Sequence, residues 1–542
     1  MTVSCSPTAV QSGQTSSCTA TVTGTGSFNT AVSWGSSAGT VDANGVFTAQ
    51  AVTASTSVTV NAASVQDTTQ VGSATVTVTP VSAISVACTP AAIQPRQSSQ
   101  CIASANGSST TTVNWSSNIG TIPFGTISAS GLFTAPQVTA STQATITAVT
   151  QVANVTGTTS VTVNVNNTAP LVVDGGPTVN GVSIGYPNGV YATVTVCTKD
   201  ATTCQTIDHV LVDTGSVGFR VLSSALGSVS LQGQKLSDGS WLAECYVRPD
   251  GYAWGSVALA QVQVAGEIAA PIPVEVIAPS GFSAAPVSCT TQTTGGALST
   301  VSTLKANGIL GIGLSVQDCG STCATGTPAP NTYSYYSCPS SGCFAIQVAT
   351  SEQVTNPVTL FPNDNNGSLI QFPPVFSGGS PTAQGSLIFG IGTQPNNGLL
   401  TATVYAVTAT GLNPGSFTST YNSTAYPGSI SSGANANYFL SSGITGYPGC
   451  TTNTAFYCPS SDQTVAVTNT GTNGASGAVS LTVSNADTLL LSGNTAFSNL
   501  AGPGTGRTGG FLFGVPFFYG RSVFTAINGE STPGGNGPYF AY

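Results

Sequence analysis

The residues best suited to chemistry lie at the end of an apolar run. Residues 207–212 lead directly into Asp213-Thr214-Gly215-Ser216. A carboxylate at a strand end, followed by a glycine that turns the chain and by hydroxyls that can hydrogen-bond it, is held in one orientation. An oriented carboxylate can activate water or bind a ligand. We therefore predict a site centred on Asp213 and lined by Thr214, Gly215 and Ser216, although such a triplet alone occurs in many turns.

The only histidine, His209, lies four residues before Asp213. An imidazole in this place could act as a general base. Alternation along an apolar strand, however, places His209 on the same face as Leu211 and Asp213, which favours a buried, hydrogen-bonded structural role. A Ser-His-Asp triad is not supported, because no G-x-S-x-G elbow accompanies these residues.

Four further segments accompany the Asp213 turn in a fixed order. They are residues 255–266, 306–313, 385–390 and 513–527. With the turn, they resemble the landmarks of pepsin-like aspartic proteases: the active-site loop, the flap hairpin, the N-G-I-L-G segment, the strand at the lobe junction and the closing strand. The resemblance is colinear over residues 190–530 and implies a bilobed all-β fold. The same module also resembles an uncharacterised family of secreted bacterial proteins, through residues 207–216 and 389–397.

The resemblance implies a cleft between two lobes that each supply one aspartate. Peptide hydrolysis there needs two carboxylates that share one proton. The matching turn in the C-terminal half is Ser431-Ser432-Gly433, and no Asp or Glu lies between Asp364 and Asp462. A serine therefore stands where the second aspartate belongs. We predict that Asp213 is a vestigial catalytic residue, or an active one only if another acid serves, and that proteolysis is absent or vestigial.

The segment Asp250-Gly251-Tyr252-Ala253-Trp254 resembles a flap tip. A flap covers the substrate in a protease, so the resemblance implies that Tyr252 and Trp254 face the cleft together with Ser432 and Gly433. Packing of the two aromatic rings within the hairpin is the alternative interpretation.

No cofactor and no metal are predicted. Residues 364–367, Asp-Asn-Asn-Gly, are similar to part of a calcium loop but lack its further acids, so a hairpin turn is expected. Gly311-x-Gly313 fits no dinucleotide fingerprint, because no helix or ribose-binding acid follows. Zinc at Cys319, Cys323, Cys338 and Cys343 is the alternative, although the spacings differ from the usual zinc knuckles.

The fourteen cysteines occur as close neighbours along the chain, which favours seven local disulfides in an oxidising compartment. The four between Cys319 and Cys343 allow three connectivities. The neighbours are Cys5 and Cys18, Cys88 and Cys101, Cys197 and Cys204, Cys245 and Cys289, Cys319 and Cys323, Cys338 and Cys343, and Cys450 and Cys458.

The first 166 residues contain one unit twice. Cys5-Ser-Pro recurs 83 residues later as Cys88-Thr-Pro, and both copies carry a tryptophan, a G-x-F-T-A segment and alternating Val and Thr. Short alternating strands around one tryptophan predict a small β-sandwich. The copies resemble bacterial immunoglobulin-like repeats. A stalk or spacer is the favoured role and adhesion is the alternative.

Composition excludes several function classes. The 542 residues include only 8 Lys and Arg and 17 Asp and Glu, for a net charge of −9. Average proteins are roughly a quarter charged. Eight scattered cations cannot follow a phosphate backbone, so no nucleic-acid partner is expected. No run of 18 apolar residues occurs, so no transmembrane segment is expected.

The predicted fold class is all-β, with two N-terminal Ig-like β-sandwiches and a bilobed pepsin-like β-barrel module. The expected boundaries are 1–80 and 81–166 for the sandwiches, 167–181 for a linker, and 182–390 and 391–542 for the lobes. The expected function is that of a secreted, extracellular or bacterial cell-surface protein. It would bind a peptide, glycan or protein ligand, act in adhesion, or assemble with itself into a filament or coat. The alternative is an acid aspartic endopeptidase using Asp213.

Overall fold

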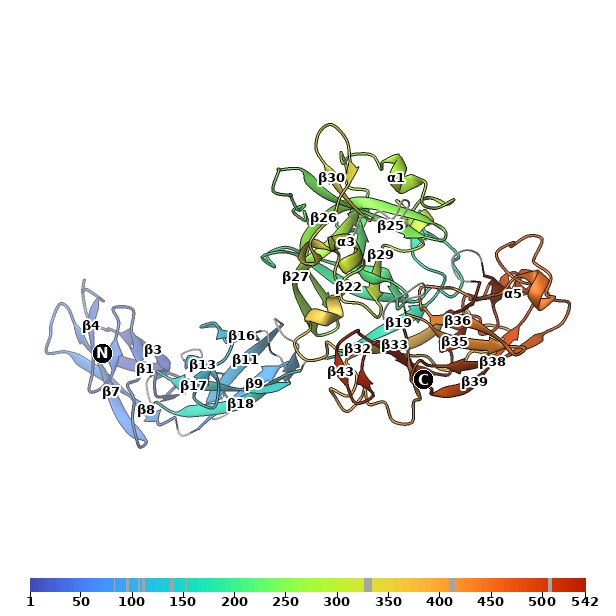
Figure 1. Ribbon diagram of the computed structural model, residues 1–542. Coiled ribbons are helices and arrows are strands. Elements are labelled where there is room, and N and C mark those ends of the chain that lie inside the picture. The colour runs from blue at the N-terminus through green and yellow to red at the C-terminus, as the bar shows by residue number, and fades with distance from the viewer. Residues whose placement is uncertain are drawn as a thin grey trace. The chain divides into compact units, whose positions relative to one another are not determined.

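A computed structural model provides the fold, and short strands dominate it (Figure 1). It describes all residues except 82, 94–96, 106, 107, 110–112, 137, 139, 140, 152, 153, 165, 326–333, 409–414 and 505–508. The described α-helices have only four or five residues each, which confirms the predicted all-β class. They are α1 (Val287–Thr290), α2 (Val301–Leu304), α3 (Ser321–Thr325), α4 (Ser442–Thr445), α5 (Ala486–Leu490) and α6 (Val515–Phe518).

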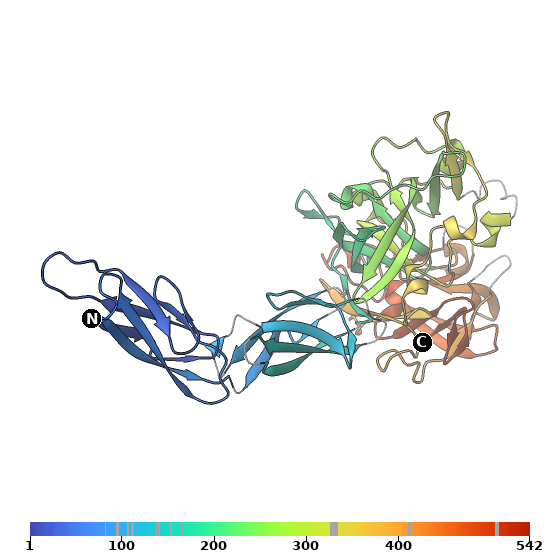
Figure 2. The same ribbon diagram turned by 90° about the vertical axis from the view of Figure 1, so that its left-hand side faces the viewer.

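The chain divides into two compact units, Met1–Val165 and Asn166–Tyr542. The first unit, drawn in blue shades in Figure 2, contains two β-sandwiches with the same strand order. In each, the alternating Val and Thr of two long antiparallel strands bury one face.

The first sandwich consists of two four-stranded sheets. Phe47 from one sheet and Val58, Val60, Val76 and Val78 from the other share a single apolar core. The sheets are β1 (Thr2–Ser6), β3 (Thr15–Thr21), β6 (Val46–Thr48), β5 (Thr40–Val41), and β2 (Ala9–Gln11), β8 (Val71–Thr79), β7 (Thr56–Ser64), β4 (Val32–Ser36).

The second sandwich repeats this arrangement around Phe133, Ile146 and Val161. One sheet contains β9 (Ile84–Thr89), β12 (Ser108–Ser109), β11 (Ser98–Ala105), β16 (Leu132–Thr134) and β15 (Thr126–Ile127). The other contains β10 (Ala92–Ile93), β18 (Thr156–Val163), β17 (Thr142–Thr150), β13 (Val113–Ile119) and β14 (Ile122–Pro123).

The second unit starts earlier than the sequence predicted. Residues 167–181 were expected to be an unpaired linker, but they include β19 (Thr168–Val173). This strand pairs with β33 (Ala383–Phe389) along its whole length and with β22 (Tyr191–Thr198) at Val172. The reason is its alternation, which buries Ala169, Leu171 and Val173 despite the neighbouring proline.

The first lobe of this unit is a closed barrel. Strands β26, β27, β24, β29, β23 and β22 follow one another, and β22 also pairs with β26, which closes the ring. Besides β22, the barrel and the strands that pair with it comprise β23 (Cys204–Asp213), β24 (Val217–Leu222), β25 (Trp241–Arg248), β26 (Gly251–Val264), β27 (Glu267–Ile277), β28 (Gly296–Ala297), β29 (Gly308–Ile312), β30 (Tyr335–Cys338) and β31 (Phe344–Ala345).

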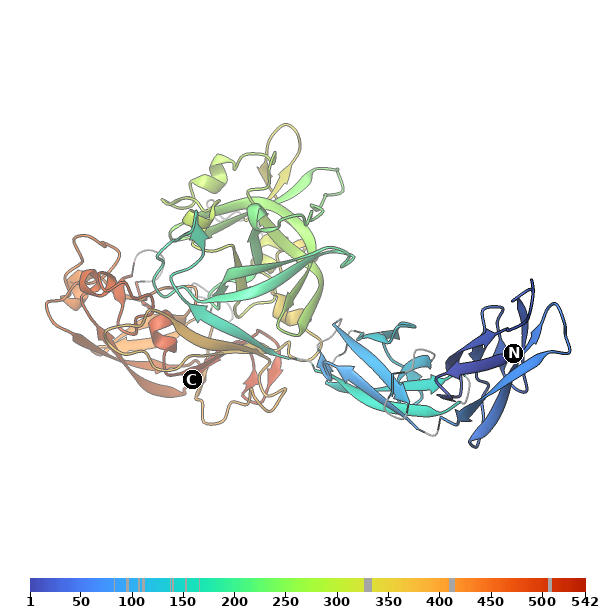
Figure 3. The same ribbon diagram turned by 180° about the vertical axis from the view of Figure 1, so that it is seen from behind.

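The second lobe is a seven-stranded sheet, drawn in orange shades in Figure 3. Its core is aromatic, with Phe417, Phe439, Phe511 and Phe513 in contact. The strand order is β39 (Ser476–Val483), β38 (Gln463–Thr470), β35 (Phe417–Tyr421), β36 (Thr424–Ile430), β41 (Phe511–Phe513), β37 (Asn437–Phe439) and β40 (Ala501–Pro503).

A junction sheet joins the two lobes. It continues from β19 through β33 to four further strands, two of which lie near the end of the chain. These are β32 (Gly367–Gln371), β42 (Ser522–Ala526), β45 (Tyr539–Ala541) and β34 (Val404–Ala406). Two short hairpins complete the unit: β20 (Thr178–Val179) with β21 (Val182–Ser183), and β43 (Ser531–Thr532) with β44 (Gly535–Asn536).

All fourteen cysteines form the seven local disulfides expected from their spacing. The open connectivity resolves into Cys319–Cys323 and Cys338–Cys343. Disulfides of this number are typical of proteins outside the cytoplasm. Among the described residues, no helix is long and apolar enough to cross a membrane.

A glycine that recurs in both sandwiches provides a test of their packing. Gly45 has φ +83°, and a Cβ there would lie 2.4 Å from the Cys18 carbonyl oxygen and 2.9 Å from the Trp34 ring. We expect Gly45→Ala to destabilise the first sandwich by about 3 kcal/mol, from the left-handed backbone and the clash together. Calorimetric unfolding of the full chain measures this.

Gly26→Ala is the matched control for this substitution. Gly26 has φ +78°, but nothing lies within 4 Å of its added Cβ. Only the backbone term should appear, about 1 kcal/mol. Equal effects of the two substitutions would contradict the packing described here.

Candidate functional site

Asp213 is placed by three strands of the first lobe. It is the last residue of β23, which pairs in parallel with β29 so that Asp213 lies opposite Gly311. The chain turns and returns as β24, which pairs antiparallel with the other edge of β29. The carboxylate therefore projects from a turn between two strands that share one neighbour.

Ser431 is placed by the same arrangement in the second lobe. Strand β36 ends at Ile430 and pairs in parallel with β41, and β37 then pairs antiparallel with the other edge of β41. The Ser431 amide donates to the Phe513 carbonyl at 3.0 Å. The two turns thus occupy equivalent positions in their lobes, and the position equivalent to Asp213 is occupied by a serine.

The two turns are joined by a hydrogen bond between these side chains. The Ser431 hydroxyl donates to Asp213 Oδ1 at 2.8 Å, and the Gly215 amide donates to the same oxygen at 2.7 Å. The Gly433 amide donates to Ser431 Oγ at 3.1 Å, as its counterpart in the other turn. Asp213 is 7% exposed and Ser431 8% exposed. The carboxylate is therefore fixed by donors from both lobes.

Thr214 and Ser432 form a second, reciprocal connection. The Thr214 amide donates to Ser432 Oγ at 3.1 Å, and the Ser432 amide donates to Thr214 Oγ1 at 3.0 Å. The Ser432 hydroxyl in turn donates to the Val212 carbonyl at 2.7 Å. Both side chains are buried. Removal of either hydroxyl would leave a buried amide without an acceptor, which makes this connection expensive to break.

The glycines of the two turns are required by close approach. A Cβ on Gly215 would lie 2.5 Å from Ser431 Oγ, and a Cβ on Gly433 would lie 2.3 Å from Asp213 Cγ. Each glycine therefore provides the space that the functional side chain of the other lobe occupies.

No second carboxylate is hydrogen-bonded to Asp213 or Ser431 within the part of the chain that the structure describes. Two of the acids that follow Ser431, Asp462 and Asp487, have other partners. Asp462 accepts from Ser484 Oγ at 2.6 Å, and Asp487 accepts from the backbone and side chain of Asn453. What faces Asp213 across the lobes is a hydroxyl group.

The flap hairpin presents different residues from those expected. Cross-strand partners share a face, and Trp254 lies opposite Cys245 while Tyr252 lies opposite Val247. Trp254 is buried, donates from its indole to the Ser283 carbonyl at 2.7 Å and packs in one apolar cluster with Tyr252. The predicted cleft role of Tyr252 and Trp254 is thus not what the contacts show; both belong to hairpin packing.

The opposite face of β25 carries Glu244, Tyr246 and Arg248, which the sequence reasoning missed. Their alternation in the strand was the available signal, since these residues lie one position out of phase with the packing face. Burial raises the pKa of Tyr246, and the Asp213 carboxylate raises it further. Tyr246 is therefore within electrostatic reach of Asp213.

Arg248 joins the same environment at the end of the hairpin. Its guanidinium forms an ion pair with Asp250 at 2.9 Å. Burial opposes its charge, but Asp250, Tyr246, Tyr186 and Asp213 outweigh that effect and raise the pKa of Arg248. The carboxylate of the site thus has a permanent cation and two phenols nearby.

The side-chain contacts of His209 are with residues outside the Asp213–Ser431 site. Its φ of +47° interrupts the alternation of β23, so the expected common face with Asp213 does not form in a regular way. The ring lies 3.1 Å from Asp174 Oδ2 and 3.0 Å from Asp208 Oδ2, and packs against Tyr191. These contacts give His209 a hydrogen-bonded position that is partly exposed.

The alternative ligand sites considered from sequence are occupied by protein contacts. Every cysteine is in a disulfide, so the zinc alternative lacks thiolates. The oxygens of Asp364 accept from the Thr393 hydroxyl and from the Gln394 amide. Gly311 lies in β29 and Gly313 donates to the Ser216 carbonyl, so both serve strand packing.

Comparison with known proteins adds the family. The search of solved structures finds the aspartic proteinase from Irpex lacteus, at 14% identity and a TM-score of 0.40, with 69% of this chain and 96% of that chain covered. No curated protein matches the sequence. Residues 163–542 match the family model described as "Protein of unknown function (DUF3443)". The chain belongs to the DUF3443 family.

The DUF3443 match covers the unit that carries the site. It begins at residue 163, next to the start of the second compact unit at Asn166, and continues to the last residue. Asp213, Ser431 and the flap hairpin therefore all lie inside the family module, and the two sandwiches precede it.

Ser432→Ala tests the connection between the lobes. The substitution leaves the buried Thr214 amide without its acceptor, so we expect the DUF3443 module to lose about 1–3 kcal/mol of unfolding free energy. Urea denaturation measures the loss. Thr206→Ala removes one side of the exposed Thr195–Thr206 hydrogen bond and should cost less than about 0.5 kcal/mol. Similar losses in both variants would contradict a special role for the turns.

Proposed function

We propose that this protein is an exported, extracellular or cell-surface binding protein whose module keeps the cleft architecture of an aspartic protease without its second acid. The observation that carries the proposal is the hydrogen bond from Ser431 Oγ to Asp213 Oδ1. A partner peptide, glycan or protein is held at this site, in adhesion or in assembly of an extracellular filament or coat. The two sandwiches act as an Ig-like stalk.

The chemistry of the Ser431 hydroxyl supports a binding site that does not hydrolyse peptides. An aspartic protease needs one ionised carboxylate to take a proton from water and one protonated carboxyl to support the developing oxyanion. A serine hydroxyl has no accessible second protonation state at acid or neutral pH and cannot alternate between these roles. Its single proton is directed at Asp213. The pair therefore fixes a carboxylate rather than sharing a proton.

The surroundings of Asp213 support recognition. The Asp213 carboxylate, the Arg248 guanidinium and the Tyr246 phenol influence one another electrostatically. Hydrogen-bond donors, an acceptor and aromatic surface in one place suit a polar ligand with amide groups.

Digestion of an unfolded protein substrate at about pH 4, where a carboxylate pair would share a proton, tests the proposal. We expect the wild type to release no fragments. Ser431→Asp restores a carboxyl opposite Asp213, with the Gly433 amide placed to donate to it as Gly215 donates to Asp213. We expect this variant to gain cleavage that is abolished by a further Asp213→Asn substitution.

Ser431→Asn is the matched control, because it has the shape of aspartate without the acid. We expect this variant to release no fragments. Cleavage by the wild type that is lost in Asp213→Asn would overturn the proposal in favour of an acid endopeptidase with another second acid. A silent but folded Ser431→Asp would show that the module lacks more of the catalytic apparatus than one residue.

A further inference from the structure

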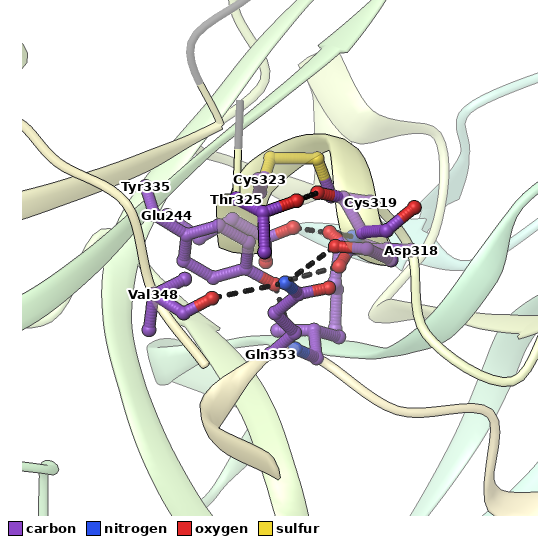
Figure 4. The surroundings of a disulfide bond; sticks show 12 residues. Glu244, Asp318, Cys319, Cys323, Thr325, Tyr335, Val348 and Gln353 are labelled. Carbon is purple, nitrogen blue, oxygen red and sulfur yellow. Dashed lines mark hydrogen bonds and ion pairs between the residues drawn. A yellow bond between two sulfur atoms is a disulfide. The ribbon is translucent and has the colours of Figure 1, made fainter. Parts of the chain in front are cut away.

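A buried cluster of charges includes Glu244 of the flap hairpin and lies beside the Cys319–Cys323 disulfide (Figure 4). Its only cation is Arg220, which is 0% exposed. The guanidinium forms ion pairs with Glu244, with Glu275 at 3.3 Å and with Asp318 at 3.1 Å. The Tyr335 hydroxyl donates to Asp318 Oδ1 at 2.7 Å. One arginine thus faces three carboxyls from three separate segments.

The cluster cannot be fully ionised without a large penalty. Three carboxylates against one guanidinium would leave excess negative charge in a dry interior, where unpaired charge is costly. Burial raises the pKa of Glu244 and of Glu275 to about 7, although Arg220 opposes the shift in both. Burial, followed by Glu244, raises the pKa of Asp318 well above its usual range. The cluster therefore holds protons in acid and releases them near neutral pH.

The same residues connect the hairpin to β24, the strand that follows the Asp213 turn. Arg220 lies in β24, directly after the turn, and its Nη1 donates to the Val217 carbonyl at 2.7 Å. Its guanidinium lies 3.8 Å from the ring centroid of Tyr246. Glu244 and Tyr246 occupy one face of β25, the first strand of the hairpin. Arg220 therefore joins the hairpin strand β25 to β24 through an ion pair and a cation–π contact, and its hydrogen bond to Val217 lies within β24.

We propose that the Arg220 cluster is a proton-operated latch that holds the β25–β26 hairpin against β24, the strand that follows the Asp213 turn, in acid and loosens it near neutral pH. The groups that face Arg220 are Glu244 and Tyr246 of β25, Glu275 of β27, Asp318 before α3 and Tyr335 of β30. Each carboxylate formed by proton loss adds repulsion between these elements, and β25 carries one of them. The latch regulates access to the proposed binding site at Asp213. This regulatory role rests on the proposed function.

The direction of the pH effect follows from the coupling between protonation of the cluster and closure of the hairpin. A carboxyl whose pKa is raised in the closed state favours that state below its ordinary value near 4.5, and the contribution is lost as the pH rises through about 7. The hairpin should thus be most firmly closed in acid.

Hydrogen exchange followed by mass spectrometry, on the full chain at about pH 5 and about pH 8 and corrected for intrinsic rates, tests the latch. We expect peptides covering β25 and β26 to lose about tenfold or more of their protection at the higher pH, as expected for a pKa shift of more than one unit. Glu275→Gln removes one titrating carboxyl and keeps an oxygen for Arg220. In this variant the pH-dependent loss should shrink at least threefold.

Glu267→Gln is the matched control. Glu267 is also buried, and burial, then Asp364, raises its pKa to about 8, but it is the first residue of β27, opposite Val264 at the far end of β26. It should leave the pH response of residues 244–256 unchanged. Glu244→Gln provides a second neutralisation should Glu275→Gln fail to fold, and melting curves at acid pH identify that case.

Two outcomes overturn the latch: equal hairpin protection of the wild type at both pH values, or an undiminished pH response in the folded glutamate-to-glutamine variants. The exchange measurement uses no ligand and no substrate. Proteolysis by the wild type would thus overturn the proposed function and leave this result standing, and the reverse also holds.

Discussion

The module depends on the hydrogen-bonded contact between two turns, one from each lobe. Thr214 and Ser432 exchange amide-to-hydroxyl bonds, and Ser431 donates to Asp213. Because every one of these groups is buried, each donor needs its acceptor in the other lobe, and the position of one lobe fixes that of the other. Gly215 and Gly433 permit the approach. The parallel pairing of β23 with β29 and of β36 with β41 places the turns at this contact.

A serine at position 431 gives this contact different electrostatics from a pair of carboxylates. Two carboxylates at hydrogen-bond distance cannot both be ionised, so a protease site there must hold a shared proton. A hydroxyl that donates to one carboxylate removes the repulsion and the proton exchange together. In the proposed function, the serine keeps the hydrogen bonds between the two turns and provides no second carboxyl for catalysis. The hydrogen bonds between the turns need donors, whereas hydrolysis by a carboxyl pair needs acids.

Local patterns predicted the strands and the disulfides well, because alternation and cysteine spacing act within short segments. The directions of side chains near the site were harder to predict. The flap resemblance favoured Tyr252 and Trp254, but the cross-strand register of β25 and β26 turns these rings into the hairpin core and places Tyr246 and Arg248 on the other face. A positive φ at His209 similarly breaks the alternation that the prediction assumed. The strand in the expected linker forms only because β33, more than 200 residues later, pairs with it.

The buried acids give the module an unusual dependence on pH. Most proteins lose stability in acid, because carboxylates that are paired in the folded state must take up protons. Glu244, Glu275 and Glu267 have pKa values raised by burial, so they contribute in the opposite direction and favour the folded state in acid. Hydrogen bonds lower the pKa values of the exposed Asp200 and Asp238, which oppose this trend. In the proposed latch, this contribution holds the β25–β26 hairpin more firmly in acid than near neutral pH, which is the reverse of a contact held together by exposed salt bridges.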